Sequence, residues 1–224
     1  MESENTQAEE TAVMHDVSRR RFFQLAGGLA AVGVFVASCR RTPPDTVYVG
    51  KGDVALLNNL LILEEVLSAV YMQANLTAYY GLSKSELDLL ADMRDHQLAH
   101  KELLKKVLGT NAITDVVTVL SAVTYADRND FLRNSVMLED IAVAAYNGAA
   151  KRFTDTSYVL LTAKMATLQA RHSAYSRELL AHNTFADNVI INTNGLDQVM
   201  EPLSVFNALK PYIQTKFDIS NLPA

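Results

Sequence analysis

The sequence predicts an all-α protein, a bundle of four helices with one long crossover between the second helix and the third. Three observations lead to this class. Apolar residues recur every three or four positions over long stretches, which is the helical period. Glycine and proline number only 9 and 5 among 224 residues, so few positions interrupt those stretches. One pattern of residues also occurs twice along the chain, which predicts two similar helical hairpins.

Composition places the chain among ordinary globular proteins. It is 49% hydrophobic and 20% charged, with a formal net charge of −5, and its length suffices for one domain with a substantial core plus a tail. No basic stretch is interleaved with aromatic residues, which argues against a nucleic-acid partner. No Ser-His-Asp order, phosphate loop or cofactor fingerprint supports a hydrolase or a nucleotide-binding protein. Composition leaves a homo-oligomer open.

Residues 1–39 have the organisation of an export signal. A polar, acidic stretch precedes Ser-Arg-Arg-Arg-Phe-Phe at residues 18–23, and an apolar run follows at 25–37. That run is shorter than the roughly 20 apolar residues of a spanning helix, so the cationic patch and the run together indicate export. The twin arginine before Phe22 resembles the signal of the twin-arginine translocase, which carries folded cargo.

Cys39 is a predicted lipidation site. Val-Ala-Ser-Cys at residues 36–39 resembles a bacterial lipobox, in which the cysteine is lipidated and becomes the first residue of the mature protein. It is the only cysteine, so no intramolecular disulfide can form; an unmodified thiol is the alternative. Residues 40–52 then form a short, stiff tether to a domain at 53–224. We therefore expect a lipid-anchored protein of the bacterial cell envelope, attached to a membrane and facing an extracytoplasmic space.

The helices are predicted from apolar stripes and from the signals at their ends. Gly81 breaks the first helix, and Ser83 with Glu86 forms a capping box that starts the second. Gly109 ends the second helix, and weak periodicity at 110–126 indicates the crossover. Pro211 stops a short last helix that covers the bundle. The expected helices span residues 53–80, 83–108, 130–153, 155–182 and 203–209.

Six polar residues interrupt the apolar stripes of the four long helices. They are Glu64, Gln97, His100, Glu139, Gln169 and His172. Each half of the chain carries Leu-Glu-acid-x-x-x-Ala-x-Tyr-x-x-Ala on its first helix, at residues 63–74 and 138–149. Each half then carries Met-x-x-x-Gln-x-x-His on its second helix. Polar side chains within a core are costly unless they bond to one another, so these six side chains are candidates for one site.

Counting along the hairpins predicts that the six residues meet. Glu64 lies 18 residues before Leu82 and His100 lies 18 after it. Glu139 lies 16 residues before Asp155, and His172 lies 17 after it. Equal counts mean equal height in antiparallel helices that short loops join. A 17-residue crossover can reach roughly 55 Å, more than the roughly 36 Å length of a 24-residue helix, so helices two and three can run parallel.

From residue 53 to residue 213 the chain resembles the ferritin-like domain family that includes plant desiccation-related proteins and many exported bacterial proteins. The resemblance rests on Glu-Asp-Ile-Ala-Val-Ala-Ala-Tyr-Asn-Gly-Ala-Ala at 139–150, Ala-Arg-His at 170–172, and a tail from Glu-Pro-Leu at 201–203 to Pro-Tyr-Ile at 211–213. It implies a ferritin-like bundle with a di-metal centre, built from one Glu on each of two helices and Glu-x-x-His on each of the others.

Carried over residue by residue, the resemblance leaves the di-metal centre incomplete. The two single carboxylates match Glu64 and Glu139, and the histidines match His100 and His172. The two bridging glutamates of the family are replaced by glutamines, Gln97 and Gln169. Four carboxylates would offer two divalent cations four negative charges, whereas this chain offers two, and an amide adds one weak oxygen ligand without charge.

Two functional hypotheses follow from this departure. In the first, the protein is an exported ferritin-like bundle with a degenerate metal centre, closed by hydrogen bonds, in a structural or stress-linked role. In the second, the two Glu and two His hold one or two iron, manganese or zinc ions, in an oxidoreductase or a metal-sequestering protein.

Three neighbouring residues have weaker claims to the site. Tyr71 and Tyr146 lie seven residues beyond each Glu and are expected as core aromatics with bonded hydroxyls, or as residues that orient the carboxylates. His96 and His100 have the spacing of a surface metal pair. Lys101 beside them, and the place of His100 on the apolar stripe, argue against that pair.

Overall fold

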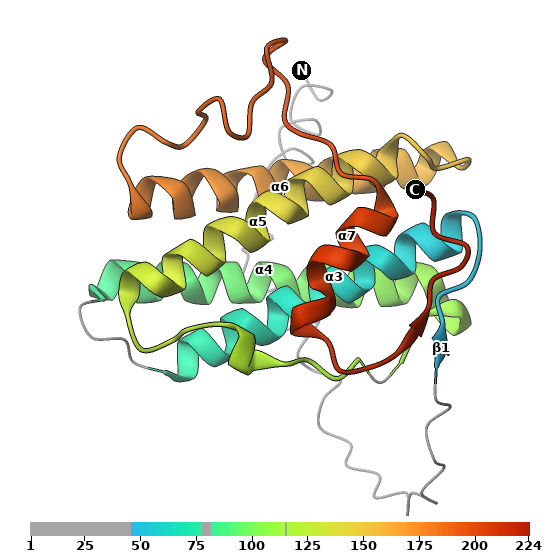
Figure 1. Cartoon of the computed structure of the whole chain (residues 1–224), viewed down its shortest axis with the longest axis horizontal. Coiled ribbons are helices and arrows are strands. Elements are labelled where there is room, and N and C mark those ends of the chain that lie inside the picture. The colour runs from blue at the N-terminus through green and yellow to red at the C-terminus, as the bar shows by residue number, and fades with distance from the viewer. Residues whose placement is uncertain (1–45, 78–81, 115) are drawn as a thin grey trace, which may run out of the picture. The chain divides into compact units, whose positions relative to one another are not determined.

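Four long helices form the body of the computed structural model, which describes residues 46–77, 82–114 and 116–224 (Figure 1). They are α3 (Asp53–Leu76), α4 (Lys84–Leu108), α5 (Arg128–Ala150) and α6 (Thr156–Leu180). Helix α3 packs with α4, and α5 packs with α6, as two hairpins. The predicted all-α class is therefore confirmed. The predicted export signal and Cys39 lie outside the described residues.

Local signals explain most helix ends. The predicted capping box is present, since the Ser83 side chain accepts from the Glu86 N–H and the Glu86 carboxylate accepts from the Ser83 N–H. Asp127 caps α5 by accepting from two backbone N–H groups, so this helix begins two residues earlier than expected. It also ends earlier, at Ala150, and α6 ends at Leu180. The carboxylate of Asp155 caps α6.

The crossover runs the length of the bundle. It contains two single-turn 3-10 helices, η1 (Gly109–Asn111) and η2 (Leu120–Ala122). Gly109 adopts φ 56°, a conformation that glycine tolerates and that turns the chain out of α4. The crossover returns the chain to the opposite end, so that α4 and α5 run in the same direction (Figure 1). This is the predicted parallel arrangement.

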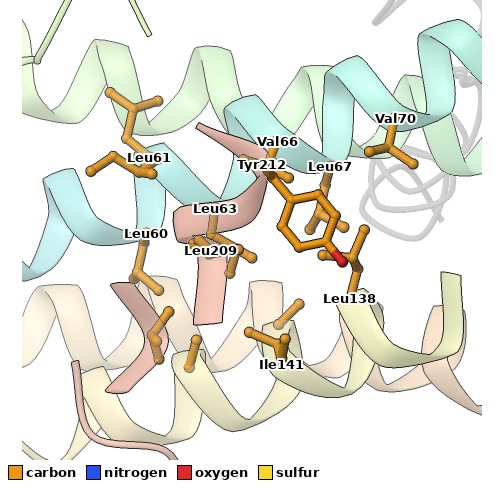
Figure 2. Packing of buried hydrophobic residues seen from close by; sticks show 14 of the residues in the cluster. Leu60, Leu61, Leu63, Val66, Leu67, Val70, Leu138, Ile141, Leu209 and Tyr212 are labelled. Carbon is orange, nitrogen blue, oxygen red and sulfur yellow. The ribbon is translucent and has the colours of Figure 1, made fainter. Parts of the chain in front are cut away.

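Helix α3 is the centre of the core. Leu60, Leu61, Ile62 and Leu63 are consecutive and all at most 1% exposed, so this helix is covered on every side. By length and composition α3 could cross a membrane, with a mean hydropathy of 1.5, but 83% of that window is buried inside the protein. Figure 2 shows its leucines facing α5 on one side and Leu209 and Tyr212 on another. An all-round apolar helix is expected at such a position.

The C-terminal region closes the bundle across α3 and α5. Helix α7 (Pro202–Leu209) packs on both of these helices (Figure 1), and η3 (Lys210–Tyr212) follows it. Strands β1 (Val47–Tyr48) and β2 (Phe217–Asp218) form a short parallel pair that the sequence did not predict.

Residues 183–200 form turns and one bridge, Ile191 to Asp197, and lie along α5 and α6. This segment reaches α5 at a glycine. Met200 N–H donates to Ala144 C=O at 3.0 Å. A Cβ on residue 148 would lie 1.9 Å from Met200 O, which no side chain permits. Gly148 is thus required for the close approach of the two backbones.

Candidate functional site

The six predicted polar side chains converge in one buried layer at mid-height. Glu64, Gln97, Glu139 and Gln169 are fully buried, while His100 and His172 are 8% and 5% exposed. One Glu comes from each of α3 and α5, and one Gln-x-x-His pair comes from each of α4 and α6. The apolar stripes must face inward, and the equal heights then bring these side chains together.

The two glutamines form a reciprocal amide pair at the centre of this layer. Gln97 Nε2 donates to Gln169 Oε1 at 3.0 Å, and Gln169 Nε2 donates to Gln97 Oε1 at 2.9 Å. The second N–H of each amide is directed to a carboxylate. Gln97 donates to Glu139 Oε1 at 3.1 Å, and Gln169 donates to Glu64 Oε1 at 2.9 Å. The pair therefore joins α4 to α6 and links both carboxylates.

On either side of the amide pair lies a carboxylate with an imidazole. His100 Nδ1 is 3.4 Å from Glu64 Oε1, and His172 Nδ1 is 3.7 Å from Glu139 Oε2. Tyr146 also donates its hydroxyl to Glu64 Oε1 at 2.5 Å. Burial, and then the negative charge of Glu64, raise the pKa of Tyr146 well above its ordinary value of 10.0. The Tyr146 hydroxyl therefore stays protonated and donates a hydrogen bond to Glu64 at physiological pH.

Tyr71, the equivalent of Tyr146, makes a different bond. Its hydroxyl lies 2.7 Å from Ser135 Oγ, which in turn lies 3.0 Å from Ser176 Oγ. Burial, and then the charge of Glu139, raise its pKa well above 10.0. Both tyrosines are therefore buried aromatics with bonded hydroxyls, as the sequence suggested, and Tyr146 in addition orients a carboxylate.

A seventh residue, His96, extends the site toward the surface. Its Nδ1 lies 3.1 Å from His172 Nε2, and the two rings are stacked with centroids 5.3 Å apart. Gln97 Nε2 also lies 3.3 Å from His172 Nδ1, so His172 stands between Gln97 and His96. In the sequence, His96 had been considered together with His100, its neighbour on α4, as a surface metal pair. Only the packing of α4 against α6 shows that its partner is His172.

Donors are fewer than acceptors in the centre of the site. Among the described residues, Glu64 Oε2, Glu139 Oε2 and His100 Nδ1 are buried without a hydrogen-bond partner. The four amide protons are all used, and Gln97 already faces three acceptors. Buried acceptors without donors are costly, so this site would gain stability from one or more further donors or from a cation.

The residues do not fit a bridged di-metal centre. Bridging carboxylates would have to stand where the amide pair stands, and the amide N–H groups point toward the two remaining carboxylates. A single cation is better matched, because atoms that share one zinc ion at about 2.0–2.1 Å lie roughly 3.3 Å apart, close to the separation of Glu64 and His100. Across the described part of the chain, however, no three carboxylate, imidazole or thiol groups gather into a ligand set.

Comparison with known families agrees with this arrangement of helices. The family model of the ferritin-like domain matches residues 52–182, which is more than half of the chain. The chain belongs to the ferritin-like domain family. No curated protein matches the chain. Many ferritin-like domains bind metals, and in this member Gln97 and Gln169 form a reciprocal amide pair at the centre of the polar layer.

Proposed function

We propose that this protein is an exported, lipid-anchored ferritin-like protein in which an amide pair has replaced the di-metal centre, and that its role is structural or stress-linked and not catalytic. The observation that carries the proposal is the reciprocal bonding of Gln97 and Gln169. Where the family has two bridging anions, this chain has two neutral groups that bond to each other.

In this proposal the amide pair connects the helices in place of metal ions. A di-metal centre would tie four helices together through its ligands. Here the hydrogen bonds of two amides join α4 to α6, and each amide also reaches a carboxylate on α3 or α5. Hydrogen bonds to charged groups contribute about 1.5–3 kcal/mol each. A closed network of this kind can hold the bundle in one arrangement without a cation.

Elemental analysis of the purified protein tests the proposal directly. We expect no stoichiometric iron, manganese or zinc after incubation with Fe(II), Mn(II) or Zn(II) and gel filtration. The double variant Gln97→Glu/Gln169→Glu restores two carboxylates at the bridging positions and should gain two metal ions per chain. Stoichiometric metal in the wild-type protein, lost in Glu139→Ala, would overturn the non-metal role.

A second candidate function is the binding of one cation beside the amide pair. The buried atoms Glu64 Oε2, Glu139 Oε2 and His100 Nδ1, which have no hydrogen-bond partner among the described residues, favour it. Glu64 with His100, or Glu139 with His172, would hold a zinc, iron or manganese ion, whose chemistry would be that of a Lewis acid or a redox centre. Metal lost from His100→Ala but retained in His172→Ala would place the ion beside Glu64, and the reverse result would place it beside Glu139.

The export route and the anchor are also proposals, supported by the sequence of residues 18–39. Folded export followed by lipidation of Cys39 would place the domain on the extracytoplasmic side of a membrane in the bacterial cell envelope. Mass spectrometry of the mature N-terminus from a bacterial host should show a diacylated or triacylated Cys39. Replacement of Arg19, Arg20 and Arg21 by lysine should leave the precursor in the cytoplasm, whereas Cys39→Ser should permit export but abolish the lipid. An unmodified Cys39 in the processed protein would exclude the anchor.

A further inference from the structure

Helix α5 is apolar on two sides. Leu138, Ala142 and Tyr146 face the interior of the bundle and are fully buried. Val143 and Ala144 are also buried, at 7% and 6% exposed, although they lie outside this core and line the space beneath residues 183–200. A helix at the outside of a four-helix bundle needs only one apolar stripe. The second stripe therefore requires its own cover.

The cover leaves a cavity of about 660 Å³ between α5, α6 and residues 183–200. We call it the α5 cavity, and its walls include Val136, Ile141, Val143, Ala170, Phe185 and Ile190. Pockets of about 300–1,000 Å³ with mainly apolar walls are the usual form of small-molecule sites. At its edge Phe185 and Val189 are 59% and 66% exposed, so the covering segment brings apolar side chains that it does not bury.

The equivalent surface of the first hairpin is covered by helices. Ile62 on α3 aligns with Met137 on α5 in the duplicated pattern. Ile62 is fully buried, because η2 and α7 cover α3, whereas Met137 is 43% exposed at the cavity wall. The chain supplies a helical cover for one helix and only a partial cover for its counterpart.

The charges of the wall favour an uncharged occupant. Asp140 is paired with Arg177 at 2.5 Å and also accepts from Ser173 at 2.6 Å. Arg133 is paired with Asp130 at 2.5 Å. Among the described residues of the wall, no unpaired cation is therefore offered to a carboxylate or phosphate. The remaining charged residue of the wall, Asp197, is an anion and would repel an anionic ligand, so burial of apolar surface is the main source of affinity.

We propose that the α5 cavity binds one uncharged apolar molecule, of the class of a medium-length alcohol, acyl or isoprenoid chain. The inference goes beyond the proposed function, because none of the six residues of the polar layer lines the cavity. The occupant completes the cover of α5 and is held against α6 by residues 183–200.

Titration of the full-length protein with 1-octanol and 1-decanol, followed by isothermal calorimetry and methyl NMR, tests the inference. We expect saturable binding of one alcohol per chain. The two extra methylene groups of 1-decanol should tighten binding roughly 15-fold, and decanoate should bind more weakly than 1-decanol. NMR shifts should centre on the methyl groups of Val143 and Ile190.

A matched pair of variants on α6 provides the control. Ala170→Phe places a ring in the cavity and should abolish binding, while Ala163→Phe, at an exposed position of the same helix outside the cavity, should not. Absence of saturable binding, or binding that Ala170→Phe leaves intact, would overturn the proposal. If Ala170→Phe does not fold, NMR shifts of the wild-type protein that centre away from Val143 and Ile190 would overturn it. A dimer that Ala170→Phe dissociates, with no alcohol bound, would assign the surface to a second copy instead.

Discussion

The hairpins α3–α4 and α5–α6 repeat one design around the polar layer and differ outside it. In both, the residue after the buried Glu forms an ion pair with a cation five residues beyond the His. Glu65 pairs with Lys105 at 2.7 Å, and Asp140 pairs with Arg177 at 2.5 Å. The repetition extends even to contacts that face away from the core. This agreement indicates that the two hairpins share their packing outside the polar layer as well as within it.

The difference lies in what covers the first helix of each hairpin. Helix α3 is enclosed by α4, α5, α7 and η2, whereas the outer side of α5 is covered by residues 183–200. A helix can bury a long apolar stripe, but an irregular segment must also bond its own backbone groups. The covering segment therefore touches α5 at a few fixed points and leaves space between them. Three pairs of equivalent substitutions, and one variant at a contact between the hairpins, test how far the two hairpins correspond.

The largest effect is expected where the covering segment touches α5. Gly148→Ala should lower the free energy of unfolding by about 3 kcal/mol, because the added Cβ collides with the backbone at Met200. For a chain of this size the melting temperature would fall by about 6–12 °C. The aligned residue of α3 is Gln73, whose side chain donates to the Thr77 hydroxyl. Gln73→Ala should change stability by about 0.5 kcal/mol or less. Equal losses in urea unfolding would contradict this account of residues 183–200.

The two tyrosines should rank next. Tyr146→Phe removes a donor from a buried carboxylate and should cost about 2 kcal/mol, whereas Tyr71→Phe breaks a bond to the Ser135 hydroxyl and should cost about 1 kcal/mol. Chemical denaturation of both variants measures the difference. The hydroxyl of Tyr146 matters more because Glu64 Oε2 already lacks a donor. A larger loss in Tyr71→Phe would mean that Glu139, and not Glu64, depends on a tyrosine.

Much of this symmetry could be predicted from the sequence, and the reasons are local. Helix positions follow from apolar periodicity, and the height of each Glu and His follows from counting residues to a short turn. Because the pattern occurs twice, each of these inferences applies to both hairpins. The identity of the residues at 97 and 169, read beside the family resemblance, predicts that two bridging carboxylates are absent, and this stays a prediction. No tertiary information was needed for any of these steps.

The partners across helices could not be predicted in the same way. Periodicity places His96 on a face of α4, but which residue of α6 meets that face depends on the rotation and offset of two helices joined only through the crossover. The same holds for the direction of the amide groups of Gln97 and Gln169. The cover of α5 was not predicted because residues 183–200 have no periodicity. In the sequence, nothing distinguishes Gly148 from the other small residues of its helix.

A smaller effect is expected at the repeated ion pair. Asp140→Asn should cost about 1–2 kcal/mol, because Arg177 is only 7% exposed and keeps a single, longer contact with Asp187 at 3.5 Å. Glu65→Gln should cost about 0.5 kcal/mol or less, since the Lys105 side chain is 36% exposed and screened by water. The comparison by thermal unfolding should be made at low and high salt. Salt should reduce the Glu65 effect more than the Asp140 effect.

The smallest effect is expected at two contacts between the hairpins. The first residue of α3 and the first residue of α5 each bond to the other hairpin. Asp53 accepts from the N–H groups of Thr154 and Asp155, and Arg128 donates through Nε to Glu86 at 2.8 Å. Asp53 is an anion and Arg128 is a cation, yet both contacts lower the pKa of a carboxyl group, that of Asp53 in the first contact and that of Glu86 in the second. Partial burial would raise the pKa of Glu86, but hydrogen bonds from Ser83 and Arg128 outweigh it, so the pKa lies below the ordinary 4.5. The pKa of Asp53 likewise lies below 3.8, because backbone hydrogen bonds outweigh burial.

A lowered carboxyl pKa stabilises the protein above the unfolded value, and this stabilisation is lost as the pH falls through the folded value. We therefore expect the melting temperature to fall as the pH drops below about 4.5. In Arg128→Gln the pKa of Glu86, followed by NMR, should rise toward 4.5. The control Arg133→Gln lies on the same helix and pairs with Asp130, so it should leave Glu86 unchanged. An unshifted Glu86 in Arg128→Gln would mean that the Ser83 capping box alone holds this carboxylate. The first hairpin would then close its turn without help from the second.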